Sequence, residues 1–254
     1  MRAADDPRAQ LLTFTGYVMT IKKPTIRVVL GRRGSGKSSL LMRWADEFPR
    51  VLVLDDLHEY APTGEDEADD YAYTLEDAIE QLRTGAQAEP PWIIYAGIDA
   101  EQYPALIAYL MPAQAGAKGY AQAVGGVCVV CGEADQLAPN HAGIDSRVKA
   151  MLHRGRHYGL SLLAATRRPT EMHRDVTGLA DIVATFAMHE PRDVRWLEQS
   201  GGQSFAVVAQ QLSAFEYATY ATDTGRVSRY DGADRLQRVE SQVSLFESPE
   251  GDRG

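Results

Sequence analysis

The chain contains 254 residues, of which 44% are hydrophobic and 24% are charged, and this size and composition predict one large α/β domain rather than two full ones. Its formal net charge of −9 argues against a surface coated with basic residues for non-specific nucleic-acid binding. No apolar run approaches the ~18 residues of a membrane span, and residues 1–20 lack the basic start and apolar core of a signal peptide, so we expect a cytoplasmic protein without a transmembrane segment.

Strand and helix patterns alternate along the chain, which predicts a mostly parallel central sheet flanked by helices. A stretch that alternates around an Asp-Thr-Gly turn at 223–225 predicts a terminal hairpin. Helices are predicted from Lys37 to about Phe48 and at Thr74–Gly85, 100–111, 145–159 and 190–200, with a shorter one before the last buried strand. Buried strands are predicted at Thr25–Leu30, Arg50–Asp55, Trp92–Ala96, Val127–Cys131, Ser161–Thr166 and Asp181–Met188.

The segment between the first strand and the first helix matches the phosphate-binding pattern GxxxxGK[ST], in the strand–loop–helix context that this pattern requires. Glycines let backbone N–H groups wrap phosphates, and the helix N-terminus adds partial positive charge. Lys37 is predicted to reach the β- and γ-phosphates of ATP, and the Ser38 hydroxyl to ligate Mg²⁺. The predicted nucleotide-binding residues are Gly31, Arg32, Arg33, Gly34, Ser35, Gly36, Lys37, Ser38 and Ser39.

Acidic residues follow the strand Val127–Cys131, at Glu133 and Asp135. A nucleotide hydrolase needs one carboxylate near Mg²⁺ and another that polarises the attacking water, usually at the end of a strand beside the phosphate loop. The alternative is a polar turn after a core strand. Cys128 and Cys131 have CxxC spacing, but residues three apart on a strand face opposite sides, which predicts core packing and not a metal site.

The order of four segments carries a resemblance: the phosphate loop, "VVCGEAD", "GRHYGLSLLAATRRP" and "ADIVATFAMHEPRDVRWL". This order resembles the FtsK–HerA superfamily of P-loop ATPases. Within that superfamily it is similar to the compact ATPases that package genomes into tailless icosahedral viruses of the double-jelly-roll type. The resemblance spans roughly Arg27 to Glu198. It implies a RecA-like P-loop NTPase core, a homo-oligomeric ring (commonly a hexamer) with ATP between subunits, and double-stranded DNA in the central pore.

The resemblance also implies roles for particular residues. Lys37 and Ser38 take the phosphate-loop roles, Glu133 takes that of the catalytic carboxylate, and Arg167 falls at the polar sensor position after a strand. Arg154 or Arg156 is a candidate for the arginine that reaches a neighbouring subunit's γ-phosphate, with a basic helix end as the alternative for either one.

Two positions depart from the family pattern. Members usually have Asp-Glu where this chain has Gly132-Glu133, so Asp135, or Asp55 and Asp56 after the second strand, are candidates to replace the missing acid near Mg²⁺. The sensor is often Gln, whereas Arg167 cannot accept a hydrogen bond from water. Slow hydrolysis is therefore one outcome that the sequence allows.

The function predicted from these features is an ATP-driven motor that translocates double-stranded DNA and packages a viral genome. The alternatives are a membrane- or capsid-associated assembly ATPase of a phage, a nucleotide-binding subunit with little hydrolysis, and a small-molecule kinase. We expect work in the host cytoplasm, with docking at a capsid vertex or viral membrane protein. The loop 111–126, with Lys118 and Tyr120, is a candidate pore loop, and the acidic stretch 55–70 is expected to be a solvated surface loop.

The same features divide the chain into three parts. Residues 1–24 form an N-terminal segment, residues 25–232 form the P-loop ATPase domain with its terminal hairpin, and residues 233–254 are expected to be a flexible tail.

Overall fold

The structure is a computed structural model, and it describes residues 11–14, 17–20, 23–60, 71–114 and 117–240. Parts of the predicted N-terminal segment (residues 1–10, 15–16 and 21–22), of the predicted tail (241–254) and of the acidic stretch 55–70 (61–70) lie outside these ranges. The strands of the main sheet are β3 (Ile26–Leu30), β4 (Arg50–Leu54), β5 (Tyr71–Ala72), β6 (Trp92–Ala96), β7 (Val127–Cys131), β8 (Leu160–Thr166), β9 (Ile182–Phe186), β10 (Tyr217–Ala221), β11 (Arg226–Tyr230) and β12 (Leu236–Glu240).

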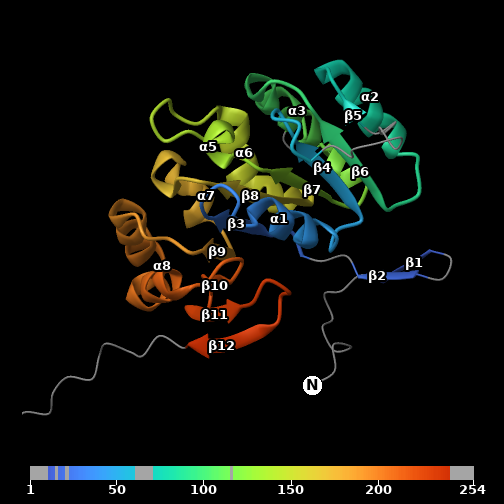
Figure 1. Ribbon diagram of the computed structural model, residues 1–254. Helices are drawn as coiled ribbons and strands as arrows, with labels where there is room; N and C mark the ends of the chain where they lie inside the picture. The colour runs from blue at the N-terminus through green and yellow to red at the C-terminus, as the bar shows by residue number, and fades with distance from the viewer. Residues whose placement is uncertain (1–10, 15–16, 21–22, 61–70, 115–116, 241–254) are drawn as a thin grey trace, which may run out of the picture.

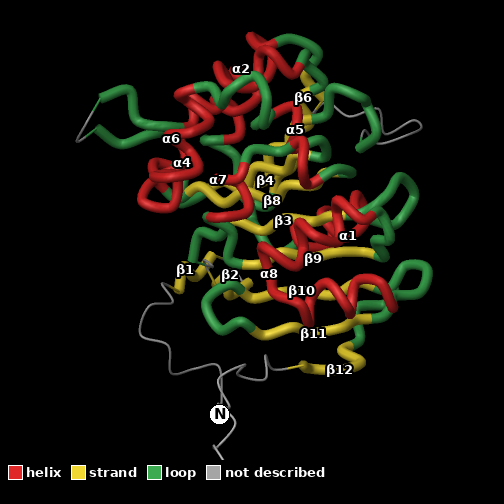
Figure 2. Tube along the Cα trace, turned by 90° about the vertical axis from the view of Figure 1, so that its left-hand side faces the viewer, coloured by secondary structure: helices red, strands yellow, loops and turns green. Residues whose placement is uncertain are grey.

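These strands form one ten-stranded sheet in the order β12-β11-β10-β9-β3-β8-β7-β4-β6-β5 (Figure 2). The strands from β9 to β5 pair in parallel, while β10, β11 and β12 pair antiparallel at one end. The predicted α/β class with a mostly parallel central sheet is confirmed. A second sheet consists of the short hairpin β1 (Leu11–Phe14) and β2 (Tyr17–Thr20), which the sequence reading of residues 1–24 missed.

Helices cover both faces of the main sheet (Figure 1). One face carries α1 (Lys37–Ala45), whose Leu40 and Leu41 are buried against β3, β4, β7 and β8. The other face carries the apolar sides of α2 (Leu75–Gly85), α3 (Tyr103–Leu110), α6 (Ser146–Arg154), α7 (Arg174–Gly178) and α8 (Pro191–Gln211). The remaining helices are the one-turn α4 (Tyr120–Ala123) and α5 (Ala134–Leu137).

The two cysteines illustrate how the sheet separates two cores. Cys128 packs in the cluster beneath α1, whereas Cys131 packs in the cluster on the opposite face. Both are buried free thiols, and burial holds the pKa of each far above its usual value. The prediction that they pack in the core is confirmed, and the described residues contain no group of His, Cys, Asp or Glu side chains placed to hold a metal ion by themselves.

Several element ends differ from the sequence prediction. The helix predicted at 145–159 is α6 followed by a 3-10 turn at Gly155–Tyr158, which Gly159 ends in the left-handed conformation at φ 79°. The helix predicted to end at Ser200 continues to Gln211 beyond a break at Gly202, where φ is 83°. Both positions use the freedom of glycine to adopt positive φ.

The predicted hairpin is present as β10 and β11, but the chain does not leave the sheet after it. Residues Leu236–Glu240, expected to lie in a flexible tail, form β12 and pair antiparallel with β11. Backbone hydrogen bonds to a neighbouring strand stabilise this short polar segment, which composition alone could not reveal.

Strand register decides which loops meet. Leu30 at the end of β3 pairs with Thr166 at the end of β8. Cys131 at the end of β7 lies beside Ala164 of β8 on one side and Leu54 of β4 on the other. Since these strands are parallel, the segments that follow them all leave the sheet at one edge. None of the described helices has the length and apolar character that crossing a membrane requires.

Candidate nucleotide site

The loop from Gly31 to Ser38 has the conformation that its glycines were predicted to allow. Gly34 and Gly36 have φ of 74° and 105°, values that side chains disfavour. The Lys37 ammonium donates to the carbonyl of Arg32 at 3.0 Å, so the loop wraps around its own lysine. Burial lowers the pKa of Lys37 below its usual value, and the charge of Glu133 opposes that shift.

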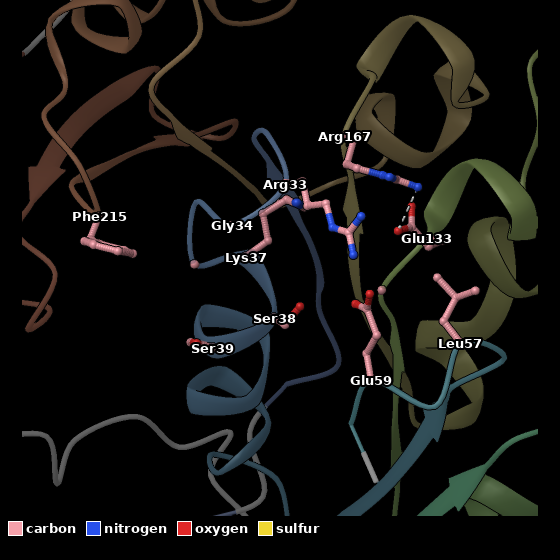
Figure 3. Close-up of a pocket in the computed structure, with 12 residues that line it drawn as sticks. Arg33, Gly34, Lys37, Ser38, Ser39, Leu57, Glu59, Glu133, Arg167 and Phe215 are labelled. Atoms are coloured by element: carbon pink, nitrogen blue, oxygen red, sulfur yellow. Dashed lines mark ion pairs between the residues drawn. The ribbon is translucent and has the colours of Figure 1, made fainter.

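A cavity of about 530 Å³ lies over this loop (Figure 3). It joins the phosphate loop to the two predicted residues from the neighbouring strands, Glu133 and Arg167. Three further lining residues, Leu57, Glu59 and Phe215, were not predicted. The complete lining is Arg33, Gly34, Gly36, Lys37, Ser38, Ser39, Leu57, Glu59, Gly132, Glu133, Arg167 and Phe215.

Glu133 lies between the end of β7 and the first turn of α5, which points its carboxylate into the cavity. Its side chain is 14% exposed and forms an ion pair with Arg167 at 3.3 Å. Burial raises the pKa of the Glu133 carboxyl, and the Arg167 guanidinium opposes the rise. The carboxylate and the guanidinium therefore hold each other next to the phosphate loop.

Asp135, predicted near Mg²⁺, lies close enough to the phosphate loop for its charge to oppose the lowering of the Lys37 pKa, and its role near Mg²⁺ stays a prediction. It does not line the cavity, and its carboxylate accepts a hydrogen bond from the Thr166 hydroxyl at 2.8 Å. This contact ties the segment after β7 to the end of β8, where Thr166 is fully buried. The geometry gives Asp135 a bracing role beneath the site.

A neighbouring tyrosine explains why residue 132, where the family pattern has an acid, is a glycine. A Cβ at this position would lie 2.6 Å from the Tyr60 hydroxyl oxygen and 2.9 Å from the Cε2 atom of the same ring. Burial raises the pKa of Tyr60 to about 12, and a hydrogen bond with the Ser38 side chain opposes the rise. The tyrosine thus fills the space beside Gly132 and contacts the serine of the phosphate loop.

Asp55, another candidate for the missing acid, builds the turn that carries Tyr60. Its buried carboxylate accepts the backbone N–H groups of Glu59 at 2.8 Å and Tyr60 at 3.1 Å. The neighbouring Asp56 donates its backbone N–H to the Tyr103 hydroxyl at 2.9 Å. Asp55 therefore folds its own loop back over the phosphate loop, and Glu59, not either aspartate, lines the cavity.

The two candidate trans arginines have different surroundings. Arg156 donates to Asp181 at 2.9 Å and to the carbonyl of Leu179, at the amino end of β9 and thus at the sheet edge opposite the phosphate loop. Arg154, the last residue of α6, is exposed. Of the two, Arg154 has the more exposed side chain.

The two residues singled out in the candidate pore loop, Lys118 and Tyr120, have different surroundings. Tyr120 begins α4, donates its hydroxyl to the carbonyl of Leu82 and packs against Tyr109, with ring centroids 5.5 Å apart and the rings tilted by 35°. Lys118 is exposed. Tyr120 therefore belongs to the packing of α2, α3 and α4, and only Lys118 of this pair presents its side chain to solvent.

Solved structures with the same architecture include the genome packaging NTPase B204 from Sulfolobus turreted icosahedral virus 2. In complex with AMPPCP it matches with a TM-score of 0.62 and 18% identity, over 87% of this chain and 100% of that one. Its sulfate complex matches with a TM-score of 0.63 and 17% identity, over 87% of this chain and 98% of that one. This chain has the B204 fold. B204 from Sulfolobus turreted icosahedral virus, a DNA-packaging ATPase, matches with a TM-score of 0.58 and 17% identity, over 87% of this chain and 100% of that one.

No protein-family model and no curated protein sequence matches the chain. The resemblance that the motifs indicated therefore finds its support in three dimensions, at the level of the fold. Two of the unpredicted cavity residues, Leu57 and Glu59, belong to the segment directly after the second strand, where acids were noticed but assigned to a surface loop. No sequence signal links Phe215 to the phosphate loop, because the two segments are far apart in the chain and come together only in the folded protein.

Proposed function

We propose that the chain is an ATPase that drives double-stranded DNA into a viral capsid. The observation that carries the proposal is the convergence of the phosphate loop, Glu133 and Arg167 around one cavity, in a fold shared with B204 packaging NTPases. A kinase would need an acceptor pocket opposite the γ-phosphate, whereas this end of the cavity holds a carboxylate and an arginine, which suit attack by water.

In this proposal the phosphate loop, Glu133 and Arg167 each have a role in hydrolysis. The backbone N–H groups of the loop and the Lys37 ammonium bind the β- and γ-phosphates. Glu133 orients the attacking water and accepts its proton, which its raised pKa favours. Arg167, released from Glu133, contacts the γ-phosphate and stabilises the charge of the transition state.

The oxygen donors at the cavity fit Mg²⁺, which binds hydroxyl, carboxylate, phosphate and water oxygens. Ser38 would be the ligand on the phosphate loop, and Glu59 and Glu133 would supply carboxylates near it. When bound, Mg²⁺ neutralises charge on the phosphates. Tyr60 contacts the Ser38 side chain and fills the space that an aspartate at residue 132 would need.

Assembly completes the site in this proposal. The chain forms a ring, with six subunits as the favoured number, and Arg154 reaches the γ-phosphate of the neighbouring subunit. DNA passes through the centre and contacts Lys118, since a pore needs basic groups only on the loops that line it. The ring works in the host cytoplasm and docks at a capsid vertex or a viral membrane protein.

A second candidate, a nucleotide-binding subunit with little hydrolysis, is favoured by one observation. The position of the expected acid is occupied by a glycine beneath a tyrosine ring, so the phosphate loop serine has a hydroxyl neighbour where a charged carboxylate is usual. The two candidates differ in turnover and not in ATP affinity.

Mg²⁺-dependent ATP hydrolysis and ATP binding, each measured with and without double-stranded DNA, test the proposal. The wild type should hydrolyse ATP faster with DNA. Lys37→Ala should lose binding, and Glu133→Gln should keep binding but lose at least a hundred-fold in turnover, as expected for the loss of a general base (about 10²–10⁴-fold). ATP binding without turnover in the wild type would favour the second candidate, and equal hydrolysis by Glu133→Gln would remove Glu133 from the mechanism.

A further inference from the structure

Phe215 is an exposed aromatic residue at the edge of the nucleotide cavity. It lies in the turn between α8 and β10, and 60% of its surface is exposed. Its ring lies on one side of the phosphate loop, while Glu133 and Arg167 lie on the other (Figure 3). The cavity thus has a charged end for phosphate chemistry and an aromatic end that the hydrolytic residues do not use.

The backbone of Phe215 is in an unusual conformation that neighbouring contacts maintain. Its φ is 63°, in the left-handed region that bulky residues rarely adopt. The Glu216 carboxylate accepts the backbone N–H of Ser213 at 2.7 Å and an N–H of Arg229 at 2.6 Å. The Glu216 N–H donates to the carbonyl of Ser213 at 3.2 Å. An exposed apolar ring held in a strained turn by an ion pair indicates a functional constraint, since folding alone favours a glycine or a polar residue there.

The ring also lies close to the phosphate loop itself. A Cβ on Gly36 would be 3.7 Å from the Phe215 Cδ1 atom and 3.4 Å from the ring of Phe186, which lies beneath it. Gly232 approaches from behind, where an added Cβ would be 3.2 Å from that of Phe215. The ring therefore borders the phosphate loop on the side away from Glu133 and Arg167.

From this placement we infer that Phe215 stacks on the nucleobase of the bound nucleotide. The inference rests on the proposed nucleotide site: with the γ-phosphate at Glu133, the sugar and base lie toward the opposite end of the cavity, where the ring is. Planar bases stack on aromatic side chains, and every base has a π-face, so stacking tolerates base changes. The expected ligand is a nucleoside triphosphate with weak selectivity between adenine and guanine from this residue.

Equilibrium binding of ATP, GTP and inorganic tripolyphosphate to the wild type, Phe215→Ala and Phe215→Leu tests the inference. Tripolyphosphate occupies the phosphate loop but has no base. Both variants should bind ATP and GTP about ten-fold more weakly, which corresponds to the loss of one stacked base, and should bind tripolyphosphate as the wild type does. Phe215→Trp should bind ATP at least as tightly as the wild type, because tryptophan offers a larger ring for stacking.

Tyr73→Ala is the matched control, since Tyr73 is another aromatic residue, 68% exposed, that does not line the cavity. It should leave all three affinities unchanged. Unchanged ATP affinity in Phe215→Leu, or equal losses for ATP and tripolyphosphate, would overturn the stacking role. If Lys37→Ala loses ATP while Phe215→Leu does not, only the stacking role fails; if the wild type binds neither ATP nor tripolyphosphate, the nucleotide site itself fails.

Discussion

The contact between Gly132 and Tyr60 gives a prediction that can be worked from the structure. In Gly132→Asp, the new Cβ would lie 2.6 Å and 2.9 Å from two atoms of the tyrosine, well inside van der Waals contact. The tyrosine ring must shift to make room, and the shift would strain its hydrogen bond with the Ser38 side chain while Asp55 holds its backbone N–H. Overpacking of this kind costs ~1–3 kcal/mol. We therefore expect the melting temperature to fall by roughly 2–12 °C.

Thermal unfolding and ATP hydrolysis of a small set of variants measure this effect. Gly132→Ala should lower stability nearly as much as Gly132→Asp, since the Cβ causes the clash and not the charge. Gly178→Ala is the control, because a Cβ there meets nothing within 4 Å. In a Tyr60→Ala background the cost of Gly132→Asp should shrink by at least ~1 kcal/mol, which is the coupling expected of residues in contact.

The single variant should also hydrolyse ATP no faster than the wild type, although it restores the acid of the family pattern. Its aspartate displaces Tyr60 and with it the hydrogen bond to Ser38. A Gly132→Asp protein that is fully stable and hydrolyses ATP faster would refute the reasoning, since it would show that the space beside residue 132 is open.

Three further predictions concern charged groups that the sequence singled out. Arg167→Gln removes a charge that holds down the pKa of Glu133, so the carboxylate of the free enzyme takes up its proton at higher pH. The acid limb of the kcat/KM–pH profile, which reports the free enzyme, should therefore move to higher pH, and an unmoved limb contradicts the ion pair. Arg156→Ala removes a half-exposed ion pair with Asp181 and should lower the free energy of unfolding, measured in urea, by ~1 kcal/mol. Arg154→Ala should change that free energy by less than ~0.5 kcal/mol, yet it should reduce ATP hydrolysis in the assembled protein. Asp55→Ala leaves two backbone N–H groups of the following turn without their acceptor and should cost ~1–3 kcal/mol in the same urea assay.

Part of the site was predictable because local pattern fixes local structure. The phosphate loop requires glycines at positive φ, and both Gly34 and Gly36 have it. Glu133 and Arg167 follow parallel strands, so the alternation of strands and helices was enough to expect them at one edge of the sheet. The packing of Cys128 and Cys131 on opposite faces followed from the two-residue period of a strand.

The remaining features depend on contacts between distant segments. The reason for Gly132 lies in Tyr60, which reaches it only because a buried aspartate folds the turn after β4. Phe215 comes from the far end of the chain and is brought to the loop by the antiparallel extension of the sheet. Arg156 occupies a position where the sequence allows a trans arginine, but Asp181 holds its side chain. No pattern in the sequence joins those two residues.

The central claim, ATP-driven movement along double-stranded DNA, is tested most directly by displacement of a third strand from a triplex at one end of a linear duplex. The account predicts displacement by the wild type that requires ATP and Mg²⁺, increases with protein concentration as rings assemble, and is lost in Glu133→Gln. ATP hydrolysis that proceeds without displacing the third strand, at any protein concentration, would contradict it.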